Sequence, residues 1–395
     1  MRSRSVHSRL RRAGASALAV VLVFGLSVPS LAFAKVSVDE TELAQGENAV
    51  GGGKATLTDS TLDMVDVVAN ELRTDESLDM NFNGGNEIEN VVVEGDANVE
   101  MSFTGENEVE DIYATDNANL TVNADGHNDF EELEGSGSAN VTVNVTGENS
   151  FEEIRGLDNA NVTVQGTDCQ MKDTINLGED EDDATLSTAW GNLTIDHVTV
   201  NLEGEYCYVG AAQGDTVIDT SKIAKGDDNE YTVIGVGGAL VVRESVIDIE
   251  GTMSSEQQMT IEHSDVKVEK PDDKWDADPY RVWSATGIDL IREKNGEVKE
   301  GEIGSRKVFY VDTDDGDDVD LEADGDPAYY GCDDDDDEEE AAAVAPLAKA
   351  LPNTGYGAGL LGTGLAWLIA AAAAVVFIAR RLQAKAYSGL HASNS

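Results

Sequence analysis

The sequence predicts an all-β protein whose body is a parallel β-helix, or β-solenoid, with coils of about 21 residues. Three observations lead to this prediction. Between residues 76 and 166 the chain repeats with a period of 21. Within each repeat, apolar and polar residues alternate with the period of two that is typical of strands. Neither helical spacing nor a leucine-rich consensus occurs in the repeats, and self-similarity at such a period indicates a solenoid.

The repeat is visible as columns of identical or similar residues spaced by 21 positions. The alanine column is Ala97, Ala118, Ala139 and Ala160, and each alanine is followed by an asparagine, namely Asn98, Asn119, Asn140 and Asn161. The other columns are Gly84, Gly105, Gly126 and Gly147; Asn86, Asn107, Asn128 and Asn149; Ile88, Val109, Phe130 and Phe151; and Val91, Ile112, Leu133 and Ile154. Six columns in register over four copies fix the length of one coil.

The apolar columns are expected to fill the interior of the stack. Adjacent coils should lie about 4.8 Å apart, the spacing of strands in a sheet. The asparagine columns are expected at turns, because asparagine tolerates left-handed backbone and bonds to nearby backbone groups. We interpret them as structural.

The pattern loosens after residue 166 but continues. The segment 193–204 aligns with 240–251, and 259–269 is a third copy, so the β-helix is predicted to extend over residues 54–270 after an N-terminal lead-in at 35–53. This rhythm of strands and turns resembles right-handed parallel β-helix proteins, which include bacterial surface adhesins and polysaccharide-acting enzymes. The resemblance covers the architecture alone, and the handedness of the coil stays open.

The composition changes again beyond the repeats. Residues 271–311 introduce aromatic side chains and are predicted to form a small β-rich cap, since solenoids need their ends covered. Trp275, Tyr280 and Trp283 could stack on sugar rings or form the core of this cap. Residues 312–350 are dominated by Asp and Glu and are predicted to be a disordered spacer.

Residues 1–34 have the composition of a secretory signal peptide. Five arginines precede an apolar segment, and Ala32 and Ala34 flank Phe33 as an A-x-A cleavage site. The sequence therefore predicts export.

The C-terminal segment 351–395 combines three features in order. The pentapeptide Leu351, Pro352, Asn353, Thr354 and Gly355 precedes an uncharged apolar segment at 356–379, which is long enough for a transmembrane helix, and two arginines follow it. This arrangement resembles the sorting signal of the LPxTG surface proteins of Gram-positive bacteria. The resemblance implies cleavage by a sortase between Thr354 and Gly355 and covalent attachment of Thr354 to peptidoglycan, after a transient membrane span.

The charge balance excludes some partners. The whole chain carries a formal charge of −52, and removing both predicted processed ends leaves residues 35–354 at −60. Nucleic acid is disfavoured as a partner, because cations that neutralise phosphates dominate that affinity. Three cysteines do not make a disulfide scaffold. Cys169 and Cys207 could pair, which would leave Cys332 single.

Acidic side chains recur in register on the repeats. The sites considered for Ca²⁺ are Glu110, Asp111, Glu131, Glu132, Glu152 and Glu153. Carboxylates on adjacent coils repel, and a bound Ca²⁺ would offset that repulsion; the alternative is a solvated acidic face. His197 and His263 occupy equivalent turns about three coils apart, too far apart to share a metal, and are expected to face solvent.

These features together predict a cell-wall-anchored surface protein without enzymatic activity, which displays a β-helix that binds an unidentified glycan or host protein. Two alternatives stay open: a β-helix lyase or hydrolase that acts on polysaccharide, and a Ca²⁺-binding structural surface-layer protein. Contact of two aspartates with an arginine in a groove would favour the enzyme. Arg155 is the only cation between residues 76 and 168, which argues against a lyase site in the regular coils.

Overall fold

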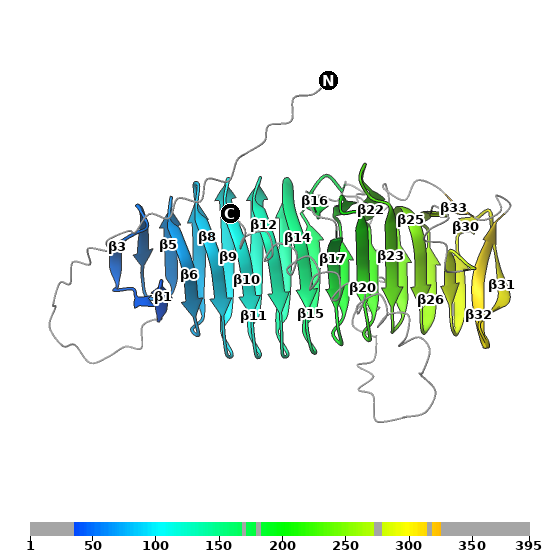
Figure 1. Cartoon of the computed structure of the whole chain (residues 1–395), viewed down its shortest axis with the longest axis horizontal. Helices are drawn as coiled ribbons and strands as arrows, with labels where there is room; N and C mark the ends of the chain where they lie inside the picture. The colour runs from blue at the N-terminus through cyan, green and yellow to red at the C-terminus, as the bar shows by residue number, and fades with distance from the viewer. Residues whose placement is uncertain (1–34, 168–170, 179–182, 272–278, 314–317, 325–395) are drawn as a thin grey trace, which may run out of the picture. The chain divides into compact units, whose positions relative to one another are not determined.

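The computed structural model describes residues 35–167, 171–178, 183–271, 279–313 and 318–324. Within these ranges the regular structure consists of strands, which form a parallel β-solenoid of about ten coils of roughly 21 residues (Figure 1). The predicted all-β solenoid is therefore confirmed. None of the described residues forms a helix long and apolar enough to cross a membrane. The predicted signal peptide and sorting signal lie outside these residues, as does most of the predicted acidic spacer.

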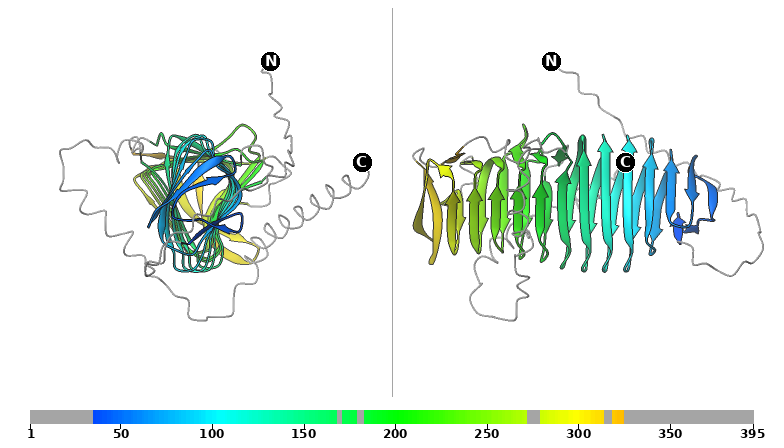
Figure 2. Two further views of the ribbon diagram at one scale, coloured as in Figure 1. Left: turned by 90° about the vertical axis from the view of Figure 1, so that its left-hand side faces the viewer. Right: turned by 180° about the vertical axis from the view of Figure 1, so that it is seen from behind.

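Two sheets line opposite sides of the coils, and Figure 2 shows the coils superimposed along the stack axis. Sheet B contains β3 (Gly46–Val50), β4 (Gly53–Leu57), β5 (Thr61–Val65), β7 (Leu78–Asn83), β9 (Asn98–Gly105), β11 (Asn119–Gly126), β13 (Asn140–Thr146), β15 (Asn161–Gly166), β18 (Leu193–Asp196), β21 (Thr216–Asp219), β24 (Leu240–Arg243), β26 (Gln258–Glu262) and β29 (Gly287–Ile291).

The described strands of sheet A fall into coil strands and end strands. The coil strands are β6 (Val68–Thr74), β8 (Glu87–Val93), β10 (Glu108–Ala114), β12 (Asp129–Gly135), β14 (Glu148–Gly156), β16 (Thr174–Leu177), β17 (Asp183–Thr188), β19 (Thr199–Leu202), β20 (Tyr206–Ala211), β22 (Lys222–Lys225), β23 (Tyr231–Val236), β25 (Val246–Ser255), β27 (Asp265–Glu269) and β28 (Val282–Ser284). The end strands are β1 (Val36–Val38), β2 (Thr41–Glu42), β30 (Glu293–Lys294), β31 (Gly296–Ile303), β32 (Arg306–Thr313) and β33 (Val319–Ala323).

The register agrees with the sequence columns. Asn119 lies opposite Asn98 on one side and Asn140 on the other, so one coil is 21 residues. In the looser part, Leu193 pairs with Thr216, which pairs with Leu240. The alignment of 193–204 with 240–251 therefore spans two coils.

Sheet A divides into two ribbons after β14. The first half of β14 pairs with β16 and its second half pairs with β17. The two ribbons continue separately through β19 and β22 and through β20 and β23, and they meet again in the ten-residue strand β25. The additional bend in these coils explains why their repeats are longer and why the sequence period is irregular there.

Antiparallel strands cover both ends of the described stack. At the N-terminal end, β3 and β4 extend sheet B antiparallel to β5, and β1 pairs antiparallel with β6. At the other end, β28 and β29 continue the parallel pairing, and the β31–β32 hairpin then pairs antiparallel with β28. Strand β33 returns antiparallel to β27 and β30. Such strands protect a solenoid from edge-to-edge association.

Four buried phenylalanines form a stack through the regular coils. Phe82 and Phe103 stack with ring centroids 4.4 Å apart, Phe103 contacts Phe130 edge-on at 5.1 Å, and Phe130 stacks on Phe151 at 4.6 Å. The first two rings come from sheet B and the last two from sheet A. The aromatic stack therefore changes sheets between two adjacent coils.

A buried polar ladder follows the turn from sheet B to sheet A. The amide of Asn86 donates to Asn107, Asn107 to Asn128, and Asn128 to Asn149, over 2.8–2.9 Å, and all four side chains are at most 2% exposed. In later coils serines take this place: the N–H of Ser221 donates to Ser245 Oγ, and that of Ser245 to Ser264 Oγ. The N–H of Ser264 donates to Glu293 Oε1 at 2.8 Å. The prediction that these asparagines lie at turns and bond to nearby backbone is confirmed, for example by the bonds of Asn86 with the N–H of Val67 and the carbonyl of Asn83, and the ladder adds bonds between the side chains.

Candidate functional site

Charged and titratable side chains gather at one turn of the later coils. Asp196, Asp219, Arg243 and Glu262 end strands β18, β21, β24 and β26 and occupy one outward column of sheet B. The next residue in three of these coils is His197, Glu244 or His263. We call these seven residues the ionic patch. In the earlier coils the same outward column holds the neutral Ser102, Asn123, Asn144 and Gln165.

The patch is held by two short contacts. Nδ1 of His197 lies 2.5 Å from Asp196 Oδ1. Arg243 donates from Nε to Asp219 Oδ1 at 3.0 Å and from Nη2 to Asp219 Oδ2. The hydrogen bond to Asp196 raises the pKa of His197, and the hydrogen bond to Asp219 raises that of Arg243. Burial, followed by the charge of Asp219, raises the pKa of Glu244. The patch thus places a carboxyl with a raised pKa beside a carboxylate that is paired with arginine.

The turn that carries the patch has left-handed backbone. In the early coils the left-handed residue of this turn is a glycine at a different register position, with φ of 91° at Gly84 and 105° at Gly126. The residues in register with His197 are Ala124, Val145 and Gly166. In the later coils His197, Glu244 and His263 adopt φ of 49–54°. A side chain in this conformation costs about 1–3 kcal/mol, and such residues concentrate at functional sites. Three titratable side chains, together with Thr220 at φ 44°, therefore hold left-handed backbone at one repeated position of the later coils.

The prediction that His197 and His263 occupy equivalent turns is confirmed. The expectation that both face solvent holds for His197, which is partly exposed, and is wrong for His263, which is 2% exposed. Its Nε2 lies 3.2 Å from the carbonyl oxygen of Asp324, just beyond the end of β33. Strand β33, whose position the repeat does not encode, covers this histidine.

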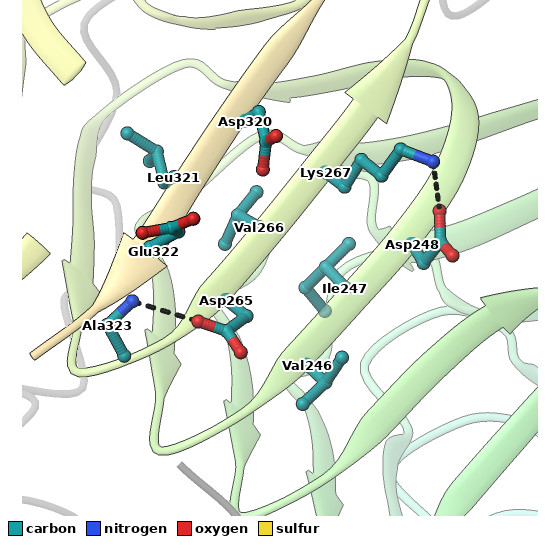
Figure 3. A pocket seen from close by; sticks show the side chains of 10 residues that line it. All are labelled: Val246, Ile247, Asp248, Asp265, Val266, Lys267, Asp320, Leu321, Glu322 and Ala323. Carbon is teal, nitrogen blue, oxygen red and sulfur yellow. Dashed lines mark hydrogen bonds and ion pairs between the residues drawn. The ribbon is translucent and has the colours of Figure 1, made fainter. Parts of the chain in front are cut away.

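A shallow hollow of about 430 Å³ lies beside this end of the stack, between β25, β27 and β33 (Figure 3). Asp248, Asp265, Asp320 and Glu322 line it together with Lys267. Lys267 Nζ lies 3.8 Å from Asp248 Oδ1, and the N–H of Ala323 donates to Asp265 Oδ1 at 2.8 Å. These contacts connect β33 to the coils, so we interpret the hollow as the joint of that strand.

Glu293 gives this joint a pH dependence. Burial raises the pKa of Glu293 to about 7, above its usual value near 4.5, with Asp265 and Glu262 adding to the effect. A raised pKa means that the group's contribution to stability is complete below about pH 4.5 and is lost as pH rises through 7. We expect Glu293→Gln to remove about 1–2 kcal/mol of the difference in unfolding free energy between pH 5 and pH 8, a value reduced for partial exposure.

The measurement is urea unfolding of the wild-type and variant proteins at both pH values. Glu297→Gln on the exposed face of β31 serves as the control for loss of one carboxylate from an acidic chain. Equal pH profiles for wild type and Glu293→Gln would contradict the prediction.

The predicted acidic column contains carboxylates from adjacent coils. Asp111, Glu132 and Glu153 lie in register on β10, β12 and β14. Arg155 lies among them, with Nη1 3.0 Å from Glu153 and Nη2 3.0 Å from Glu134 and in contact with Glu132. The part of the chain that the structure describes contains no group of three His, Cys, Asp or Glu residues placed to hold a metal ion. The Ca²⁺ sites at Glu110, Asp111, Glu131, Glu132, Glu152 and Glu153 stay a prediction.

Two of the three aromatic residues that were considered for sugar binding, Tyr280 and Trp283, lie close to the same residue, Tyr310. Tyr280 stacks on Tyr310 at a centroid distance of 4.0 Å, and Trp283 pairs with Tyr310 across β28 and β32. Both side chains pack the terminal hairpin onto the coils. Trp275 lies outside the described residues, as do Ala32, Ala34, Cys169 and the sorting residues 351–355.

Sequence reasoning missed the most exposed large apolar side chain among the described residues. Trp190 is 56% exposed, and Leu157 on the preceding coil is 40% exposed. The N–H of Trp190 donates to the carbonyl of Asp158 at 2.8 Å, which fixes the turn. Trp190 lies between two repeats and belongs to none of the repeated columns, so the periodicity did not identify it.

Comparisons with protein-family models, with curated proteins and with solved structures gave no significant match for this chain.

Proposed function

We propose that the protein is exported, attached to the cell wall through Thr354, and displays its β-solenoid as a binding surface outside the cell. The solenoid supports this proposal, because a long stack with covered ends holds many outward columns in fixed register. The ionic patch supports binding, since it places charges of both signs on the outer face. The single observation that carries the anchoring is the order of pentapeptide, apolar segment and arginines in residues 351–381. The partners of the anchoring step are a sortase and peptidoglycan.

Substitution at the pentapeptide tests the anchoring. We expect Thr354→Ala to abolish covalent attachment, because the acyl donor's side chain and the cleavage sequence are altered together. The measurement is immunoblotting of muramidase-released wall, membrane and medium from a sortase-positive Gram-positive host that expresses the full chain. Thr363→Ala in the apolar segment is the matched control. Wall-linked Thr354→Ala protein at the wild-type level would contradict the proposal.

A second candidate function is cleavage of polysaccharide. It is favoured by the contact of Arg243 with Asp219 and by the position of Asp196 in register on the adjacent coil. Glu244, with its raised pKa, would act as the acid, and an ionised aspartate as its partner. The appearance of new reducing ends or unsaturated products from neutral or acidic polysaccharides would distinguish this function from binding alone.

A further inference from the structure

The outer face of sheet B is mainly polar where the Trp190 turn meets it. The outward residues of β18 and the turn before it are Asn192, Thr194 and Asp196. The preceding coil presents Asn161, Thr163 and Gln165, and the following coil Asp215, Val217 and Asp219, in register with them. Trp190 lies at one edge of this face and the ionic patch at the other. The chain bends at Trp190 and Gly191 and then runs extended from Asn192 to Asp196, which corresponds to roughly 13 Å.

The edge around Trp190 is rigid. Thr188 Oγ1 donates to the carbonyl of Gly191 at 2.7 Å, and the N–H of Asn192 donates to Asn161 Oδ1 at 2.9 Å. Asn192 Oδ1 in turn accepts from the N–H of Asp215 at 2.9 Å. Because the turn is bonded to the coils on both sides, little conformational freedom of the backbone remains to be lost when a ligand binds.

Small and polar residues occupy the corresponding turns of the next coils. By the register of β17 with β20 and of β18 with β21, the residue opposite Trp190 on the next coil is the exposed Gln213, which lies between Ala212 and Gly214. Gly237 and Gly238 follow one coil further along. The backbones approach so closely that a Cβ at Gly237 would lie 2.1 Å from the carbonyl oxygen of Ala212. A larger side chain cannot replace glycine there without a shift of the backbone. The exposed ring thus has the polar Gln213 as its neighbour in register on the next coil.

We propose that this face binds a linear, uncharged polysaccharide, which stacks on Trp190 and extends across Asn192 and Thr194 toward Asp196. An exposed indole offers an apolar face to the C–H side of a pyranose ring, while amides, hydroxyls and carboxylates match sugar hydroxyls. The carboxylates Asp196, Asp215 and Asp219 and the charge of the chain disfavour an anionic polymer. The width of the face fits several sugar rings better than a single one. This inference names the partner class of the proposed display function and rests on it.

Binding is tested on the purified full chain in mild detergent, by isothermal titration with cellohexaose, mannohexaose and chitohexaose, with hexagalacturonate as the anionic probe. We expect at least one neutral probe to bind, Trp190→Ala to weaken it by about tenfold or more, and Trp190→Phe to retain most of the affinity. Trp283→Phe, at the terminal hairpin, should leave the affinity unchanged.

Three outcomes overturn the inference: no neutral probe binds, Trp190→Ala binds as wild type does, or hexagalacturonate alone binds. Unchanged circular dichroism of Trp190→Ala shows that a loss of affinity is not a loss of fold. Because the titration uses purified protein, its failure is independent of wall anchoring, which the Thr354→Ala experiment measures separately. If the detergent-solubilised protein binds a neutral probe but is not anchored to the wall, the proposed binding face stands and the proposed display on the wall is wrong.

Discussion

Replacing Arg155 by methionine is expected to lower the free energy of unfolding by about 2–4 kcal/mol at pH 7. The guanidinium contacts Glu132, Glu134 and Glu153, whose side chains are only 9–16% exposed. Removing it leaves three carboxylates from adjacent coils partly buried without their common counter-ion. Burial already raises the pKa of Glu134. The deficit should therefore shrink as pH falls toward 4, where these carboxyls take up protons.

The same column of sheet A provides a matched control. Arg73 occupies the equivalent register position four coils nearer the N-terminus, through Val92, Tyr113 and Glu134. Its ion pairs with Glu71 and Glu94 are exposed by 36–41%, so Arg73→Met should cost less than about 1 kcal/mol. Urea unfolding and hydrogen exchange of β12 and β14 measure both variants. If the two substitutions cost the same, Arg155 is a surface charge and does not join the coils.

Much of the solenoid could be predicted, because its physical cause is local and repeated. In each strand, alternate side chains point inward and pack against the corresponding side chains of the next coil. The inward positions therefore recur at a fixed spacing in the sequence, as in the columns of Ile88 and Val91. The division of sheet A after β14 could not be predicted, since the extra bend has no repeated partner. The position of β33 is likewise set by pairings with β27 and β30, such as that of Val266 with Leu321, which occur only once along the described stack.

The candidate site was predicted only in part for the same reason. His197 and His263 were placed at equivalent turns because neighbouring strands share their sequence pattern. That Asp219 pairs with Arg243 follows from a coil length of 24 residues, which the sequence does not show directly. Trp190 was missed because its importance is its exposure, and the exposure of one turn residue depends on the turns of the neighbouring coils, which no repeated column specifies.

The phenylalanine stack explains why the size of the inward residue varies from coil to coil within one column. In the coil of Phe103, the inward residue of sheet B is aromatic and that of sheet A is Val109. In the next coil the sizes are reversed, with Ala124 in sheet B and Phe130 in sheet A. All four side chains are at most 1% exposed. Each of the four coils that carry Phe82, Phe103, Phe130 and Phe151 therefore holds one large ring, and the interior accepts it from either sheet.

Exchanging the two sizes within one coil tests this account. Phe130→Val should cost about 2–4 kcal/mol, because it leaves a cavity beside Phe103 and Phe151, and Ala124→Phe alone should cost about 1–3 kcal/mol by overpacking. The double variant reproduces the arrangement of the preceding coil, with its rings in line with Phe82 and Phe103. It should therefore be more stable than the sum of the single effects predicts, by about 1–3 kcal/mol.

The coupling is measured as a double-mutant cycle by urea unfolding, with hydrogen exchange of β11 and β12 to localise the change. Ala124→Phe combined with Ile154→Val, one coil further along in sheet A, is the control pair, since the removed methylene there does not lie beside residue 124. Additive effects in the Ala124–Phe130 cycle would show that the two positions do not share one interior space. Each sheet would then determine independently whether it carries a phenylalanine, and the change of sheets between Phe103 and Phe130 would need a different cause.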